Sequence, residues 1–173
     1  MILLVLLSTG WGRINETEEE ANRRYGEPLP TTEPERLVMP PVTKSQTYKK
    51  DDYLITVFFA PSHNLADKDP SDKICWLTYR REPLKRLEMI EVQRFLQANE
   101  EEGNKWIPDG MGGYIRKDGK AYAKIGTFPY QGADVPVSVS IFSLSIFQKN
   151  GALRPDANPK IPSGVNESTL KEL

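Results

Sequence analysis

The 173-residue sequence has one cysteine, one histidine and no meaningful excess of either charge. Cys75 stands alone, so it forms neither an intramolecular disulfide nor a zinc site with other cysteines. The 23 basic residues are balanced by 24 acidic ones, so the chain lacks the overall surplus of Lys and Arg through which proteins bind phosphates. The composition therefore argues against a disulfide scaffold, a multi-cysteine zinc site and a nucleic-acid partner.

Catalytic motifs are also scarce. His63 lies in a turn-like stretch, and no Gly-x-Ser-x-Gly motif is present, so nothing points to a Ser/His/acid triad. Gly110, Gly112 and Gly113 precede a strand pattern and are not followed by Lys-Ser/Thr, which argues against a phosphate-binding loop. The sequence thus favours a non-enzymatic role, and we expect no catalytic residue and no cofactor.

One acidic loop contains Asp67, Asp69 and Asp72, whose carboxylates are of the kind that ligate a metal ion. Calcium loops alternate carboxylates with a glycine at the turn and a distal glutamate. Here Lys68 intervenes, Pro70 restricts the backbone, and the loop contains no glycine. The pattern favours a solvated loop of turn-forming Asp residues, and we assign no metal-binding residue.

The N-terminus begins with seven apolar residues, 1–7, too few to cross a bilayer as a helix. Small residues follow, as they do after the apolar region of a secretory signal. No basic segment precedes the run, so either translation starts upstream of Met1 or the run packs on the core as a short strand or helix. We expect residues 1–12 to be a truncated signal segment, and we expect no transmembrane span. The protein would then be exported to the periplasm or the extracellular space; the alternative is a cytoplasmic protein.

Two segments have the pattern of a helix. Residues 15–25 offer Asn15 as N-cap, Glu18 as its capping-box partner, and a stop at Gly26. Residues 88–98 place apolar side chains at helical spacing. A proline-rich connector, 27–45, follows the first of these helices and is itself unsuited to helix.

The first two strand patterns surround the densest internal apolar run. Residues 53–60 are rich in β-branched and aromatic side chains with apolar residues on both faces, which is typical of a central strand. We predict one strand over 48–60, with 49–52 as its polar opening or a turn. Residues 74–81 form the next strand, and the short helix-free connection predicts an antiparallel pair.

The remaining strand patterns lie after the second helix. Residues 113–117 and 120–128 flank Asp118-Gly119, which predicts a hairpin with a type I′ turn. Residues 137–147 form the last strand. Its apolar phase switches at Phe142, which indicates a bulge, a strand that moves between environments, or a break.

The predicted fold is α+β, in the order helix, two strands, helix, three strands. It is a mainly antiparallel sheet of about five strands with two helices packed on one face. We expect one domain over residues 13–147, which includes the 27–45 connector, and a flexible tail over 148–173. Each half runs from a helix into strands, although no residue-level repeat is evident.

Two patterns resemble known proteins. Tyr25-Gly26-Glu27-Pro28 closes a helix and is followed later by the strand Leu54 to Phe59. This is similar to the helix, Gly-x-Pro, strand arrangement of SmpA/OmlA-type outer-membrane assembly lipoprotein domains and of β-lactamase-inhibitor-like folds. The lipoprotein cysteine of the first family is absent. The runs 95–99, 105–106 and 114–121 are similar to small exported bacterial proteins of unknown function, which implies export and no known activity.

Surface candidates remain in two groups. The basic residues around Glu82-Pro83 would meet anionic lipid, nucleic acid or an acidic partner, or else form a solvated connector; they are Arg80, Arg81, Lys85 and Arg86. The aromatic residues cap the core or form a binding surface; they are Trp76, Trp106 and Tyr130.

The hypothesis that best fits these observations is an exported, non-enzymatic protein that binds an unknown protein partner. Binding would use an open edge strand or the sheet face that helices leave uncovered. The alternative is a small-ligand-binding protein or enzyme with a pocket between the sheet and the connector. The sequence leaves the oligomeric state open.

Overall fold

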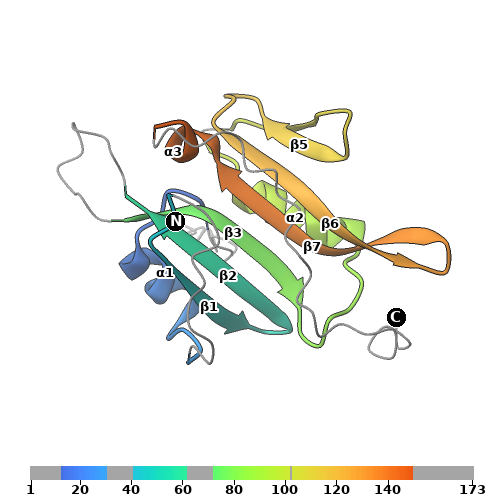
Figure 1. The fold of residues 1–173 in the computed structure, drawn as a ribbon, viewed down its shortest axis with the longest axis horizontal. Helices are drawn as coiled ribbons and strands as arrows, with labels where there is room; N and C mark the ends of the chain where they lie inside the picture. The colour runs from blue at the N-terminus through green and yellow to red at the C-terminus, as the bar shows by residue number, and fades with distance from the viewer. Residues whose placement is uncertain (1–12, 31–40, 62–71, 102, 150–173) are drawn as a thin grey trace, which may run out of the picture.

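The computed structural model describes residues 13–30, 41–61, 72–101 and 103–149. These residues form a seven-stranded antiparallel sheet in the order β1-β2-β3-β7-β6-β5-β4 (Figure 1). The strands are β1 (Lys44–Lys50), β2 (Tyr53–Ala60), β3 (Lys73–Arg81), β4 (Trp106–Pro108), β5 (Gly113–Arg116), β6 (Ala121–Tyr130) and β7 (Ala133–Ser143). The helices are α1 (Glu18–Tyr25), α2 (Met89–Ala98) and α3 (Leu144–Lys149). The predicted α+β class with an antiparallel sheet is confirmed, whereas five strands and two helices were too few.

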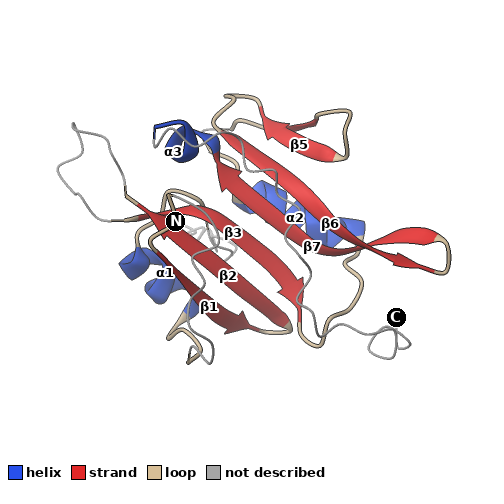
Figure 2. Ribbon diagram, viewed as in Figure 1, coloured by secondary structure: helices blue, strands red, loops and turns tan. Residues whose placement is uncertain are grey.

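The sheet consists of two halves that meet at β3 and β7. The first half runs α1, β1, β2, β3, and the second runs α2, β4, β5, β6, β7. The last strand of each half is the antiparallel neighbour of the other, with Thr78 opposite Ser140 in the middle of the paired segment. The repeat of a helix followed by strands therefore corresponds to an approximate two-fold arrangement about the β3–β7 pair (Figure 2).

The main core lies between the sheet and the two longer helices. On α2, the apolar side chains at helical spacing, Val92, Phe95 and Leu96, are buried. The ring of Phe95 stacks on Tyr79 of β3 at 4.3 Å between centroids. From α1, Ala21 and Tyr25 join the same cluster. This narrow apolar stripe is all that α1 offers, so ion pairs at its surface, such as Arg24 with Glu16, supplement the packing.

A second apolar cluster occupies the opposite face, which we call the front face. It contains Val42, Ala60, Cys75, Trp76, Phe142, Ile146 and Phe147. The phase switch at Phe142 is a break, because β7 ends at Ser143 and the chain turns into α3. Phe147 then lies against Phe142, with ring centroids 6.4 Å apart. The two predicted helices share one face of the sheet, whereas α3, which the sequence pattern does not predict, packs on the other.

Two predicted element boundaries also need correction. α1 is capped by Thr17 with Glu20 in the capping box, since Asn15 has a φ of 70° and cannot begin a helix. The predicted strand over 48–60 is in fact a hairpin, with Lys50 opposite Tyr53 across a turn at Asp51. The sequence of β1 is mostly polar, as suits an edge strand, which explains why its first residues were assigned to the connector.

The β5–β6 and β6–β7 hairpins differ from the sequence prediction. Gly119 donates to the carbonyl of Arg116 at 2.8 Å, and Asp118 does not have the positive φ that a type I′ turn requires. The left-handed pair is instead Gln131-Gly132, with φ of 50° and 81°. These two residues join β6 to β7, so both strands extend past their predicted limits of 128 and 137.

Candidate functional site

The single thiol is buried in the front-face cluster. Cys75 donates a hydrogen bond to the carbonyl of Phe58 at 3.3 Å. Desolvation raises the pKa of the thiol to about 12, so it does not supply a thiolate near neutral pH. A register shift between Phe58 and Phe59 puts Cys75 and Trp76 in one cluster and Ile74 in the other. Strict alternation along β3 would place Ile74 and Trp76 on the same face.

The acidic loop lies largely outside the described residues, as do His63, Asp67 and Asp69. Asp72 accepts a hydrogen bond from Thr43 Oγ1 at 2.5 Å. In the ranges that the structure describes, no group of three or more His, Cys, Asp or Glu side chains could hold a metal ion. The connector over 31–40 is also undescribed, so the hypothesis of a pocket beneath it gains no support.

The glycine-rich segment is the tight turn between β4 and β5. Asp109 Oδ1 accepts hydrogen bonds from the N–H groups of Met111 at 2.8 Å and Gly113 at 2.9 Å. Gly110 and Gly112 have φ of 78° and 86°. The glycines therefore allow the chain to turn about one carboxylate, and the backbone amides are used inside the turn.

The structure separates the predicted basic cluster. Arg81 Nη2 lies 2.7 Å from Glu91 Oε1 on the side of the sheet that carries α2. Arg86 Nε is 3.8 Å from Glu88 in the connector, and Lys85 is exposed. Arg80 lies on the front face, because it follows Trp76 and Thr78 at alternate positions of β3.

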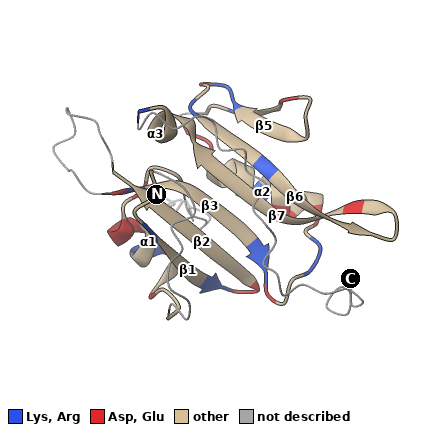
Figure 3. Cartoon of the chain, viewed as in Figure 1, with Lys and Arg blue, Asp and Glu red and all other residues tan. Residues whose placement is uncertain are grey.

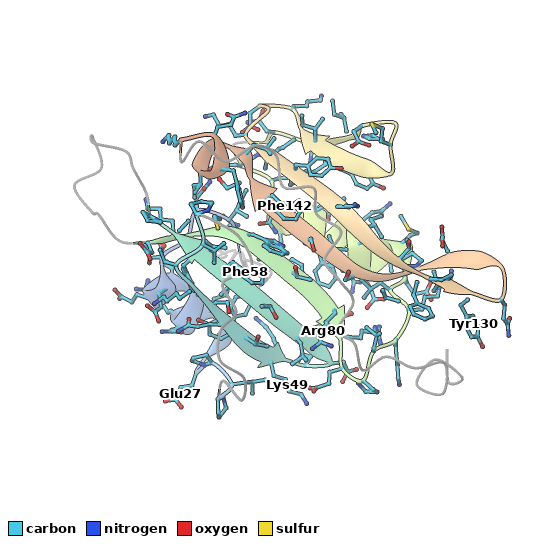
Figure 4. All side chains as sticks on the ribbon, viewed as in Figure 1. Glu27, Lys49, Phe58, Arg80, Tyr130 and Phe142 are labelled. Carbon is cyan, nitrogen blue, oxygen red and sulfur yellow. The ribbon has the colours of Figure 1, made fainter. Side chains whose placement is uncertain are left out.

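The three aromatic candidates have different environments. Trp76 is buried between Phe58 and Phe142, with ring centroids 4.1 and 5.2 Å away. Trp106 donates from Nε1 to the carbonyl of Leu96 at 2.7 Å and packs against the main core, so it caps the core. Tyr130 lies at the far end of the β6–β7 hairpin (Figure 4).

Sequence reasoning missed two buried ionic groups, although the Glu88-x-x-Glu91 capping-box pattern was a signal for the first. Glu91 is 5% exposed and accepts hydrogen bonds from Tyr53, Arg81 and the N–H of Glu88. Burial acts to raise its pKa, but these donors outweigh burial and lower it. Arg116, 1% exposed, is held in the same way by carboxylates on neighbouring turns. Both groups anchor local structure, since their polar atoms are used internally.

The centre of the front face carries a different kind of cluster. We call it the front-face site, and its members are Thr78, Arg80, Lys124, Ser138 and Ser140. Arg80 lies opposite Ser138 across β3–β7, and Lys124 lies opposite Ser140 across β6–β7. Ser140 is buried and its hydroxyl is 2.9 Å from that of Thr78, whereas Arg80, Lys124 and Ser138 are half-buried and reach solvent.

The two cations of this site have no ionic partner among the described residues. Neither Arg80 nor Lys124 forms a hydrogen bond or ion pair with a described residue. Basic segments at the end of β3 and midway along β6 flank a stretch of uncharged β7 (Figure 3). Within the part of the chain that the structure describes, the site is thus a patch of hydroxyls between two positive charges that have no acidic partner.

The other distinctive surface is the end of the β6–β7 hairpin, which we call the arm. It comprises Thr127–Tyr130 and Ala133–Pro136, which pair with each other and with no other described strand. Figure 2 shows this ribbon projecting beyond the rest of the sheet. Asp134 is its one charged residue, and Phe128, Tyr130 and Val135 are half-buried.

No described helix is long and apolar enough to cross a membrane. Comparisons with models of protein families, with curated proteins and with solved structures found no match to this chain.

Proposed function

We propose that this chain is an exported, non-enzymatic protein that acts by binding another protein, and that the arm is its principal contact surface. The observation that carries the proposal is the projecting ribbon, whose outer edges meet no other described strand. The apolar start of the sequence supports export. The buried charges also support a non-enzymatic role. Glu91 is paired with Arg81, and Arg116 is paired with Glu101, so both charges are used to hold the structure.

An isolated two-stranded ribbon is only marginally stable in water. Its unpaired backbone groups, among which Pro129 and Pro136 supply no N–H, can pair with another strand, and such β-augmentation is a common mode of protein recognition. Aromatic side chains such as Phe128 and Tyr130 add contact area at a low entropic cost. The arm therefore combines a backbone template with apolar anchors.

The surface beside the base of the arm extends this contact region. Leu87 donates its N–H to the carbonyl of Pro136 at 2.8 Å, which joins the approach to α2 to the arm. Two large apolar residues follow in the first turn of α2: Met89 is 47% exposed and Ile90 is 55% exposed. A partner seated on the arm would cover apolar area on both elements.

The test compares substitutions in the arm with matched ones in another hairpin. Full-length tagged protein is crosslinked in its source cells, and captured proteins and its own N-terminus are identified by mass spectrometry. F128S/Y130S should lose a partner that the wild-type protein captures. I107S/M111S removes two exposed apolar side chains around the β4–β5 turn and should retain that partner.

Equal capture by both variants would refute the role of the arm. An N-terminus beginning at Met1 in a cytoplasmic fraction would refute export. Thermal unfolding of the purified variants controls for folding. The first pair of substitutions lies at the end of the β6–β7 hairpin, and the second lies in the β4–β5 hairpin at the edge of the sheet.

A further inference from the structure

The front-face site contains two positively charged side chains and no negatively charged one. Among the described strand residues on the central part of this face, none is acidic; the charged side chains and the Ser and Thr hydroxyls there belong to Thr56, Thr78, Arg80, Lys124, Ser138 and Ser140. We propose that this site binds an acidic, extended segment of a partner protein. The inference rests on the proposed protein-binding function and adds the charge of the partner.

The argument begins with how other basic side chains of the sheet are used. Lys49 Nζ on β1 is 2.9 Å from Glu82, and Lys44 pairs with Glu18 of α1. Arg81, the neighbour of Arg80, is satisfied by Glu91. Arg80 and Lys124 differ because their side chains are half-buried yet meet no described acid. A partly desolvated cation without a counter-charge favours an external carboxylate.

The spacing of the two cations suits an extended chain. Arg80 and Lys124 are separated by two strand spacings and two residues along the strands, roughly 12 Å between Cα atoms from standard sheet dimensions. Side chains on one face of an extended peptide recur about every 7 Å. The flexible cations can therefore both reach carboxylates placed two or four residues apart in such a peptide.

The hydroxyls between the cations supply donors for the same ligand. A Cβ on Gly126 would come within 2.3 Å of Ser138 Oγ, so the glycine leaves room for this hydroxyl on the face. Trp76 Nε1 donates to Thr78 Oγ1 at 3.0 Å, and Thr78 is also 2.9 Å from the Ser140 hydroxyl. These contacts fix Thr78 at the floor of the site, while Ser138 faces the ligand.

A protein segment fits this surface better than a nucleic acid. Single-stranded nucleic acids are held by stacking bases on accessible aromatic faces along a strongly basic groove. Of the aromatic rings on this face, Trp76 is 7% exposed and Phe142 is fully buried, while Phe58 and Tyr122 are half-buried, with Phe58 stacked on Trp76. No fully accessible ring is therefore available among them for a base. Two cations are few for a phosphate backbone but match a short acidic peptide.

The experiment measures binding of two synthetic peptides to the isolated full-length protein. One is capped (Glu-Thr)4, and the other is capped (Gln-Thr)4 of equal length. Calorimetry and amide chemical-shift mapping should show that the acidic peptide binds, that salt weakens it, and that the largest shifts fall on β3, β7 and β6. R80Q/K124Q should bind roughly tenfold more weakly, because two charge-assisted contacts are lost.

A matched control keeps the change in net charge constant. K85Q/R94Q also replaces one Lys and one Arg, and both of these side chains are exposed elsewhere, on the connector and on α2. It should bind the acidic peptide like the wild-type protein. Equal weakening by both double variants, equal binding of the two peptides, or tighter binding of an oligothymidylate than of the acidic peptide would overturn the inference.

This titration can fail independently of the proposed function. F128S/Y130S leaves the front-face site intact and should bind the acidic peptide normally even while it loses its cellular partner. If F128S/Y130S loses the cellular partner but binds the peptide normally, the result supports the role of the arm and does not depend on the front-face site. If R80Q/K124Q binds the acidic peptide like the wild-type protein, the front-face site is refuted and the proposed role of the arm is unaffected.

Discussion

Replacing Arg116 tests whether a buried charge holds the second half of the fold together. Its guanidinium is 1% exposed and joins three segments: Nε donates to Asp118 at 3.0 Å, Nη1 to the carbonyl of Asn99 at 3.1 Å, and Nη2 to Glu101 at 2.6 Å. Arg116 therefore connects the end of α2 to the β5–β6 turn. We expect R116A to be strongly destabilising.

The magnitude follows from what each partner loses. Breaking a buried ion pair costs about 3–5 kcal/mol when the remaining charge stays buried. The Glu101 side chain is 51% exposed and can regain water, whereas that of Asp118 is 14% exposed and Asn99 is buried. We therefore expect about 2–4 kcal/mol, which corresponds to roughly 5–15 °C in Tm for a chain of this length.

Urea unfolding of the wild-type protein, R116A and R116K measures the loss directly. R116K keeps the positive charge but lacks the planar guanidinium group, so its free energy of unfolding should lie between those of the wild-type protein and R116A. K117A removes the adjacent exposed side chain and should change stability by less than about 0.5 kcal/mol. A loss below about 1 kcal/mol for R116A would refute the view that these contacts are structurally important.

The effect should also depend on pH with a defined sign. Burial acts to raise the pKa of Asp118, but hydrogen bonds from Arg116 and from the N–H of Lys120 outweigh it and lower the pKa. A lowered folded-state pKa stabilises the protein above the unfolded pKa, about 3.9, and that contribution is lost as pH falls through the folded value. The gap between wild type and R116A should therefore narrow at acidic pH.

Three further outcomes are expected. Cys75, whose pKa is raised to about 12 by burial, should be unreactive to a chromogenic disulfide reagent at pH 8 until guanidinium unfolds the chain. E91Q should lose about 1–2 kcal/mol in chemical unfolding, because it removes the ion pair with Arg81; since the pKa of Glu91 is lowered, this difference should shrink below about pH 4. G132V should cost about 1–2 kcal/mol in the same assay, because Gly132 has a φ of 81° that a β-branched residue resists; no change would mean that the arm does not depend on this turn.

The parts of the fold with strong local patterns could be predicted from the sequence. Residues 88–98 have helical periodicity and a capping box, and the helix observed is Met89–Ala98. The run 53–60 is apolar on both faces, and β2 occupies these residues and has buried side chains on both faces. In both segments the burial pattern and the intrinsic preference of the residues agree.

The parts of the fold that depend on tertiary contacts could not be predicted from the sequence. β1 has one buried apolar residue, Tyr48, and exists because its backbone pairs with β2. β4 is three residues long and gains its place from pairing with β5. Ser143 ends β7 although the apolar alternation continues, because Phe147 folds back onto Phe142. No local signal distinguishes these outcomes from a loop or a longer strand.

The candidate site shows the same limit. Arg80 was recognised as part of a basic cluster, but its three basic neighbours along the chain, Arg81, Lys85 and Arg86, are directed to other surroundings. Lys124, the other cation of the front-face site, is 44 positions away in the sequence. The two residues lie near each other only because β3 and β6 pair with opposite sides of β7. The strand order was not readable from the sequence, so the pairing of these two cations was not readable either.

The position of the front-face site follows from the two-fold arrangement of the sheet. Arg80 and Thr78 come from the last strand of the first half, whereas Ser138, Ser140 and Lys124 come from the second half. Neither half contains the site alone, so it forms only when β3 and β7 pair. A substitution that weakens this pairing, such as V139P within the paired segment, should abolish acidic-peptide binding together with cooperative unfolding. R80Q/K124Q should weaken acidic-peptide binding roughly tenfold and preserve cooperative unfolding. This difference separates a surface that binds a ligand from residues that hold the two halves together.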